Sequence, residues 1–408
     1  MEFRELWLNG KYQELYEQTK DNLNDHTAKA YYLATLFHYV GTDVVPDTIA
    51  FHKIISSHEA EFESKKETYP LEYGLFLFRL ASSLTFDYDI HHAIKIANQS
   101  IDVLENQDKF MAIFPLINLG HFYWVIGNMS KYTETILKAY DIANSGEYTM
   151  IKGFVGTLVG TLHFVMGKYD LASKYMLEGL NLLKHDYRRV YARGLITYTT
   201  QLMKIGKREE AYQYLEELEV LSNEFPVMEI KLKYLHALYN KTSNRLRHKI
   251  AAENIFRELI GDDPEDFIKK YGFISVIEDL CDLLLDELKL YGEREVYNEI
   301  VAFNKILFDY MKKSKTYNFL VTQYIIKSRL YLSDGDFNRA EEILEEAKLF
   351  FIDLGLPDLV AIIDEEIIRV ENEFKKELNK FKSNMSIAEK IKAVELSEYM
   401  KIASRFRD

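Results

Sequence analysis

The feature that most constrains this chain is a short phrase that returns about every 40 residues along the sequence. It reads Gly-Lys-Tyr-Asp-Leu-Ala from Gly167 to Ala172, and related copies begin at Gly206 and Gly335, with a cruder copy at Gly10. A fixed period of this size is typical of stacked helical hairpins, in which each repeat contacts only its neighbours. The sequence therefore predicts a helical stack rather than a single globular core.

The last residue of the phrase serves as a ruler along the chain, because the spacing between its successive copies measures the length of each repeat. It marks the beginning of the second helix of each hairpin, five residues after a glycine that ends the first helix in a left-handed cap. The central steps of the ruler are 39, 40, 39 and 40 residues, and the outer steps are 35, 43, 46 and 43 residues. The ruler positions are Leu15, Ala50, Ala93, Tyr132, Ala172, Ala211, Ala251, Tyr297 and Ala340.

A second small position lies seven residues before the turn glycine. Small residues at this point allow the two helices of a hairpin to approach each other closely, so we expect these positions to be buried. The residues that occupy this position are Ala81, Gly120, Gly160, Thr199 and Ser328.

These positions resemble the signature of the tetratricopeptide repeat superfamily. The residues that carry the resemblance are Gly120, Tyr123, Gly160, Ala172, Gly179, Ala211, Ala340 and Ala347. The period exceeds the usual value of about 34 residues, and this longer variant resembles the sensor domains of MalT-type regulators and the Rap-type peptide receptors. The resemblance implies an all-α fold, a right-handed superhelix (α-solenoid) of about nine antiparallel hairpins with a C-terminal capping helix pair.

The two ends of the chain differ from the central repeats. The first helix contains only about eight residues before Gly10, which predicts a truncated first hairpin. At the other end, Ser386 and Glu389 form a capping-box pattern that opens a helix. We therefore predict a repeat domain over residues 1–355 and capping helices, continuous with the stack, over residues 356–408.

Composition narrows the possible partners and compartments. The formal net charge is −13, and an acidic surface repels phosphate backbones, so nucleic-acid binding is disfavoured. The longest uncharged run contains 15 residues, which is too short to span a bilayer. Cys281 is the single cysteine, and no signal segment is visible at the N-terminus, so we expect a cytoplasmic protein.

The sequence contains only weak matches to catalytic or metal-binding motifs. Cys281 has no histidine partner in a catalytic pattern, and the histidines lack metal-ligand spacing, so we expect no enzyme activity, no metal and no cofactor. One alternative is an all-helical magnesium-dependent enzyme, because Asp279, Asp282 and Asp286 lie on one helix face and could hold magnesium on a diphosphate. A second acidic motif facing them is missing, which favours a solvated acidic helix face.

The inner face of the stack is the predicted binding surface, because the first helix of each hairpin lines the groove in tetratricopeptide proteins and clients lie there. Aromatic residues at these positions would anchor a partner, and Arg193 with Lys233 would donate to a carboxylate. The alternative is that the aromatic residues pack between repeats. The predicted partner-binding residues are Asn118, His121, Trp124, Phe154, Thr157, Thr161, Phe164, Arg193, Thr200, Lys233, His236 and Asn240.

These patterns together predict a non-catalytic scaffold or adaptor that binds a protein or peptide in its concave groove. A second hypothesis is a regulatory module that senses a small ligand or a signal peptide, which requires an enclosed pocket rather than an open groove.

Overall fold

The computed structural model describes residues 2–40, 44–85, 89–225, 228–271, 273–371 and 385–394. Within these ranges the regular secondary structure is helical, apart from one isolated bridge between Val40 and Val45. This confirms the prediction of an all-α helical-repeat fold. The chain divides into two compact units, unit 1 (Met1–Trp124 and Met129–Gly194) and unit 2 (Val125–Asn128 and Leu195–Asp408). The division into 1–355 and 356–408 stays a prediction.

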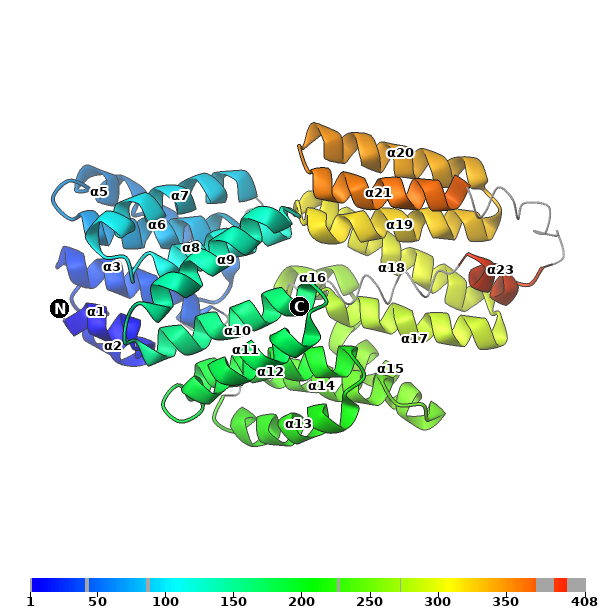
Figure 1. Cartoon of the computed structure of the whole chain (residues 1–408), viewed down its shortest axis with the longest axis horizontal. Helices are drawn as coiled ribbons and strands as arrows, with labels where there is room; N and C mark the ends of the chain where they lie inside the picture. The colour runs from blue at the N-terminus through cyan, green and yellow to red at the C-terminus, as the bar shows by residue number, and fades with distance from the viewer. Residues whose placement is uncertain are drawn as a thin grey trace. The chain divides into compact units, whose positions relative to one another are not determined.

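Unit 1 is built mainly from helices that pair with their sequence neighbours as antiparallel hairpins (Figure 1). The second helix of the hairpin around Ala50 is broken into two short pieces, α4 and α5, which accounts for the irregular ruler steps there. The helices are α1 (Glu2–Leu8), α2 (Tyr12–Thr19), α3 (His26–Thr35), the 3₁₀ helix η1 (Leu36–Tyr39), α4 (Thr48–Ser56), α5 (Glu59–Ser64), α6 (Pro70–Leu84), α7 (Ile90–Gln107), α8 (Ile113–Val125), α9 (Met129–Asn144), α10 (Thr149–Val165), α11 (Tyr169–Leu183) and the first part of α12 (Arg188–Lys204).

Unit 2 continues the hairpin pattern with one insertion. The extra helix α16 lies between α15 and α17, so the ruler step from Ala251 to Tyr297 is 46 residues instead of about 40. The helices are the remainder of α12, α13 (Arg208–Ser222), α14 (Glu229–Lys241), α15 (Leu246–Ile260), α16 (Pro264–Tyr271), α17 (Ser275–Tyr291), α18 (Arg294–Lys313), α19 (Tyr317–Asp334), α20 (Phe337–Asp353), α21 (Pro357–Arg369) and α23 (Ile387–Ala393).

The turn glycines have the backbone conformation that the repeat predicts. Gly127, Gly167, Gly206 and Gly335 have φ angles of +79°, +72°, +80° and +83°. Side-chain-bearing residues rarely adopt this left-handed region, so glycine is the residue that ends the first helix of a hairpin there. The capping box at Ser386 also forms, and it opens α23; the predicted extension of that last helix lies outside the described residues.

Gly160 and Gly120, two of the small positions, are points of close contact within a hairpin, as predicted. A Cβ atom built on Gly160 of α10 would lie 2.9 Å from the backbone nitrogen of Met176 and 3.0 Å from the carbonyl oxygen of Ala172, both on α11. Gly120 of α8 is also buried, and its Cβ would lie 2.8 Å from the side chain of Ile136 on α9. Close packing of this kind leaves no space for an added carbon.

We predict that Gly160→Ala destabilises the protein, whereas Gly156→Ala, one turn away on the same helix, does not. The added methyl group at position 160 overlaps backbone atoms, an overpacking cost of about 1–3 kcal/mol in the free energy of unfolding. At position 156 the nearest atom is 3.4 Å away, so alanine fits and adds up to ~1 kcal/mol of helix propensity. Urea denaturation measures both variants, and a Gly160→Ala protein as stable as Gly156→Ala would contradict this packing.

Candidate functional site

Helix α1 packs against the first helices of later hairpins in unit 1. Trp7 is fully buried, and its ring lies 5.1 Å from the ring of Phe114 on α8 and 6.3 Å from that of Phe78 on α6, centroid to centroid. Phe114 lies on α8, the first helix of its hairpin. The short first helix is therefore more than a truncated end unit, because it covers part of the inner face of its own unit.

Polar contacts hold the same helix at its other end. Arg4 forms an ion pair with Asp108, which follows α7, and its Nη1 donates to the hydroxyl of Tyr148, just before α10, at 2.7 Å. The hydrogen bond to Asp108 raises the pKa of Arg4 above its ordinary value. Gly10, in the turn after α1, lies against the side chain of Met150 on α10. These contacts fix α1 and the beginning of α2 on unit 1.

The beginning of α2 brings Tyr12 onto His38 of η1. The two rings are stacked, with centroids 4.1 Å apart and planes 14° apart. Burial raises the pKa of Tyr12 to about 12, and burial together with nearby arginines holds the pKa of His38 well below its usual value. Both rings are therefore neutral at pH 7, and the backbone carbonyl of His38 accepts a hydrogen bond from Nη2 of Arg189 on α12 at 3.1 Å.

Arg79 on α6 lies beside this stack and is only 4% exposed. Its guanidinium carbon lies 4.3 Å from the ring centre of Phe78, 5.1 Å from Phe37 and 5.4 Å from Trp7, and its Nε donates to the carbonyl of Ala34 at 2.6 Å. Within the part of the chain that the structure describes, no carboxylate pairs with Arg79, and burial lowers its pKa to about 9.

Arg193 lies one helical turn after Arg189 on α12, so both side chains extend from the same face of the helix. Its side chain is exposed, yet burial by the surrounding protein and the charge of Arg189 lower its pKa. Arg193 in turn affects the titration of Tyr12 and His38, which places it beside the ring stack. We call Tyr12, His38, Arg79, Arg189 and Arg193 the arginine cluster. The repeat pattern predicted Arg193 but missed the other members.

Several predicted binding residues of unit 1 reach solvent on the inner helices. His121 is exposed, although desolvation by the surrounding protein lowers its pKa, as expected for a side chain inside a concave surface. Trp124 is half-buried, with its ring 5.8 Å from His121, and it packs against the next hairpin. Phe154 and Thr161 are half-buried on α10.

The remaining predicted residues of unit 1 take part in packing. Thr157 is 5% exposed and Phe164 is 4% exposed, so the alternative of packing between helices describes both. Asn118 is half-buried and donates from Nδ2 to the hydroxyl of Ser82 on α6 at 2.5 Å, which links two neighbouring hairpins. These three side chains support the shape of the inner face.

The predicted binding residues of unit 2 do not form a comparable cluster. Thr200 is buried and donates to the carbonyl of Ile196. Lys233 is exposed and pairs with Glu258 at 3.3 Å and Glu229 at 3.6 Å, so its charge is already neutralised locally. His236 contacts Glu219 at 3.2 Å, and Asn240 is half-buried, so the role of these two residues in partner binding stays a prediction.

The acidic helix face of α17 is not solvated, which corrects the sequence-based interpretation of Asp279. Asp279 is 3% exposed and accepts from Nζ of Lys241 at 2.5 Å and from the hydroxyl of Tyr234 at 2.8 Å. Lys241 also donates to Asp282 at 2.7 Å. Burial alone would raise the pKa of Asp279, but the ammonium group of Lys241 lowers it below the usual value. Asp279 and Asp282, two of the acids predicted to hold magnesium, therefore form a buried ion-pair network with Lys241, whereas Asp286 is partly exposed and pairs with Lys249.

We predict that Lys241→Met destabilises the chain by about 3–5 kcal/mol, because it leaves Asp279 charged and buried without its cationic partner. Lys249→Met is the matched control: Lys249 pairs with Asp286 at 2.6 Å, but both side chains are about one third exposed, so the loss should stay below about 1 kcal/mol. Chemical denaturation at pH 7 compares the two variants. Equal stabilities would show that burial of the Asp279 pair has no energetic consequence.

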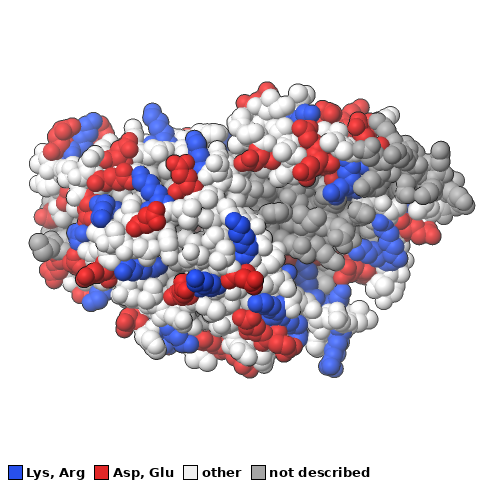
Figure 2. Space-filling model, viewed as in Figure 1, with Lys and Arg blue, Asp and Glu red and all other residues white. Residues whose placement is uncertain are grey.

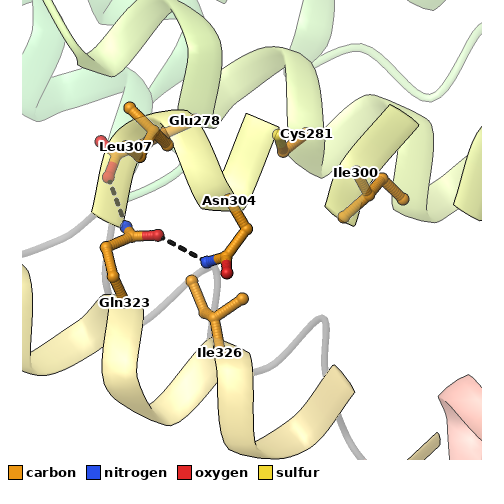
Figure 3. A pocket seen from close by; sticks show the side chains of 7 residues that line it. All are labelled: Glu278, Cys281, Ile300, Asn304, Leu307, Gln323 and Ile326. Atoms are coloured by element: carbon orange, nitrogen blue, oxygen red, sulfur yellow. Dashed lines mark hydrogen bonds between the residues drawn. The ribbon is translucent and has the colours of Figure 1, made fainter. Parts of the chain in front are cut away.

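A small cavity lies beside Cys281 in unit 2 (Figure 3). Asn304 donates to Gln323 at 2.8 Å and Gln323 donates to Glu278 at 3.1 Å, so three helices are joined by one polar chain. The cavity volume is about 10 Å³, close to the lower bound for one ordered water. A space of this size does not admit the small ligand of the sensing hypothesis.

Three further properties of the described residues concern surface charge, metal ligands and membrane-spanning helices. Acidic and basic side chains are interspersed over the face shown in Figure 2, without a broad field of one sign. In the described ranges no group of three His, Cys, Asp or Glu side chains is arranged to hold a metal ion. The helices described by the structure include none that is long and apolar enough to cross a membrane.

Comparison with known proteins finds no matching family model and no matching curated protein. One similar solved structure is that of a Rap protein complexed with competence and sporulation factor, with 12% identity, a TM-score of 0.46 and coverage of 90% of this chain and 80% of that chain. Another is a circular tandem repeat protein with novel repeat topology, with 12% identity, a TM-score of 0.22 and coverage of 91% and 97%. At these TM-scores the functional argument rests on this chain's own residues.

Proposed function

We propose that this chain is a non-catalytic helical-repeat protein that binds an extended peptide segment on the inner face of unit 1. The observation that carries the proposal is the environment of His121 and Arg193. Both side chains reach solvent, yet the surrounding protein desolvates both. These two properties support a surface on which a partner can bury both side chains further without refolding of the chain.

The chemistry of this face suits a peptide. His121, Trp124 and Phe154 present ring surface that is only partly packed, and aromatic anchors of this kind dominate binding energy when a partner covers them. The proposed partner is therefore a protein or peptide with at least one apolar side chain.

The proposal assigns no reaction to the chain. Cys281 is buried in unit 2, the described residues that line the cavity beside it include no basic side chain, and Asp279 is held by Lys241. A reactive thiol needs an accessible and electropositive site, and a metal-binding carboxylate needs an open coordination position. A single buried thiol also suits the proposed cytoplasmic location.

A library of random peptides displayed on phage tests the proposal with the full chain as bait. We expect enrichment of sequences with an aromatic or aliphatic residue, and we expect Phe154→Ala and His121→Ala to weaken an enriched synthetic peptide. Truncation of a buried anchor typically costs about 2 kcal/mol or more, so calorimetry should show a loss of affinity above tenfold for at least one variant.

Two variants on α11, the second helix of the same hairpin, serve as controls. Leu182 and Lys174 are exposed there, so Leu182→Ala and Lys174→Ala remove an apolar and a charged side chain from outside the proposed face. Both should bind the peptide as tightly as the parent. If no peptide is enriched, the proposal of peptide binding fails. If an enriched peptide binds Phe154→Ala and His121→Ala as tightly as the parent, the peptide binds elsewhere on the chain.

A further inference from the structure

The arginine cluster concentrates positive charge inside a chain whose formal net charge is −13. Burial of an arginine removes its hydration, and a protein normally compensates with a carboxylate or several hydrogen bonds. Arg79 receives neither: three ring faces and one carbonyl surround its guanidinium group, and the described residues supply no acid to it. An uncompensated buried cation suggests that its partner is a ligand.

Helix α12 brings two further cations to the same place. Arg189 is fixed by its hydrogen bond to the carbonyl of His38, and Arg193 follows it by one turn. Both side chains extend from the same face of α12, which brings their guanidinium N–H donors close to each other. Guanidinium groups are also the side chains best shaped for oxyanions, because their N–H donors match two oxygens at once.

The neutral members of the cluster fit the same role. Tyr12 and His38 stack face to face and stay uncharged at pH 7, so neither competes with an anion for the arginines. Trp7 packs against the same stack, with its ring centre 5.0 Å from that of Tyr12. The arrangement is a rigid apolar surface beside several N–H donors, which favours one orientation of a small planar or tetrahedral anion.

We propose that the arginine cluster of unit 1 is a binding site for an oxyanion group, either a carboxylate or a phosphoryl group, carried by the ligand. This assignment rests on and deepens the proposed function, since it names the chemical group that the bound peptide places beside Tyr12 and His38. A peptide carboxylate and a phosphorylated side chain share the chemistry that the cluster recognises.

The two tryptophans of the chain provide a direct readout. In protein labelled with 5-fluorotryptophan, ¹⁹F NMR shows one resonance for buried Trp7, next to Arg79, and one for Trp124, which serves as an internal reference; a spectrum of Trp124→Phe assigns them. Sodium phosphate and sodium acetate are titrated separately at constant ionic strength, balanced with chloride. We expect a saturable shift of the Trp7 resonance, and the anion that binds more tightly identifies the preferred group.

Exposed arginines on α12 supply matched variants that do not disturb the core. Arg189→Gln and Arg193→Gln should each raise the apparent Kd at least about tenfold, the loss expected for one charge-assisted hydrogen bond. Arg188→Gln makes the same charge change one residue away, and its Kd should equal that of the parent. Absence of a saturable shift with either anion, or equal effects of Arg188→Gln and Arg189→Gln, would overturn the site.

The outcomes also separate this site from the proposed function. If a small anion binds as expected but no displayed peptide is enriched, the anion site stands and the peptide proposal fails. If an enriched peptide binds equally well to the parent and to Arg193→Gln, and saturating phosphate or acetate leaves its affinity unchanged, the anion site is overturned while peptide binding on the inner face stands.

Discussion

The burial of Trp7 is the contact on which the inner face of unit 1 depends. Its indole ring meets Phe78, Phe114 and Tyr12, and thereby holds α1 against helices that follow it by many residues in the sequence. Loss of a fully buried aromatic side chain typically costs about 3–5 kcal/mol. Once α1 is fixed, the turn at Gly10 sets the beginning of α2, and this places the ring of Tyr12 on His38.

The same contact shapes the electrostatics of the unit. Trp7, Phe37 and Phe78 surround the guanidinium group of Arg79 with ring faces, and attraction between a cation and aromatic rings offsets part of its lost hydration. The aromatic rings therefore stabilise the packing of α1, and they also surround a buried cation. A ligand with a negative charge would meet this cation in a poorly hydrated environment, where electrostatic interactions are strong.

Unit 2 uses buried charge differently. Arg329 on α19 pairs with Glu366 on α21 at 2.5 Å and donates to the carbonyl of Val394 after α23, and all of these groups are buried. Lys241 and Asp279 form a second buried pair. Buried pairs contribute little net stability compared with apolar packing, but leaving one partner alone is costly, so they favour one arrangement of the helices. In unit 2 these buried cations face carboxylates of the same unit, whereas no carboxylate among the described residues pairs with Arg79 in unit 1.

What the sequence by itself determined is the local and periodic part of the protein. The turn glycines and the small residues seven positions earlier predicted the hairpins, the left-handed caps and the tight contact of Gly160 with α11, because each feature depends on residues within one repeat. The repeat register also placed His121 and Arg193 on inner helices. Only the tertiary structure decided which of these residues meet: the docking of Trp7 on Phe114, the contact of Arg189 with His38 and the burial of Asp279 against Lys241 join segments far apart in the chain. A periodic pattern specifies the contacts between neighbouring hairpins. It carries no information about contacts across several repeats, because these depend on the sum of the small rotations between successive hairpins.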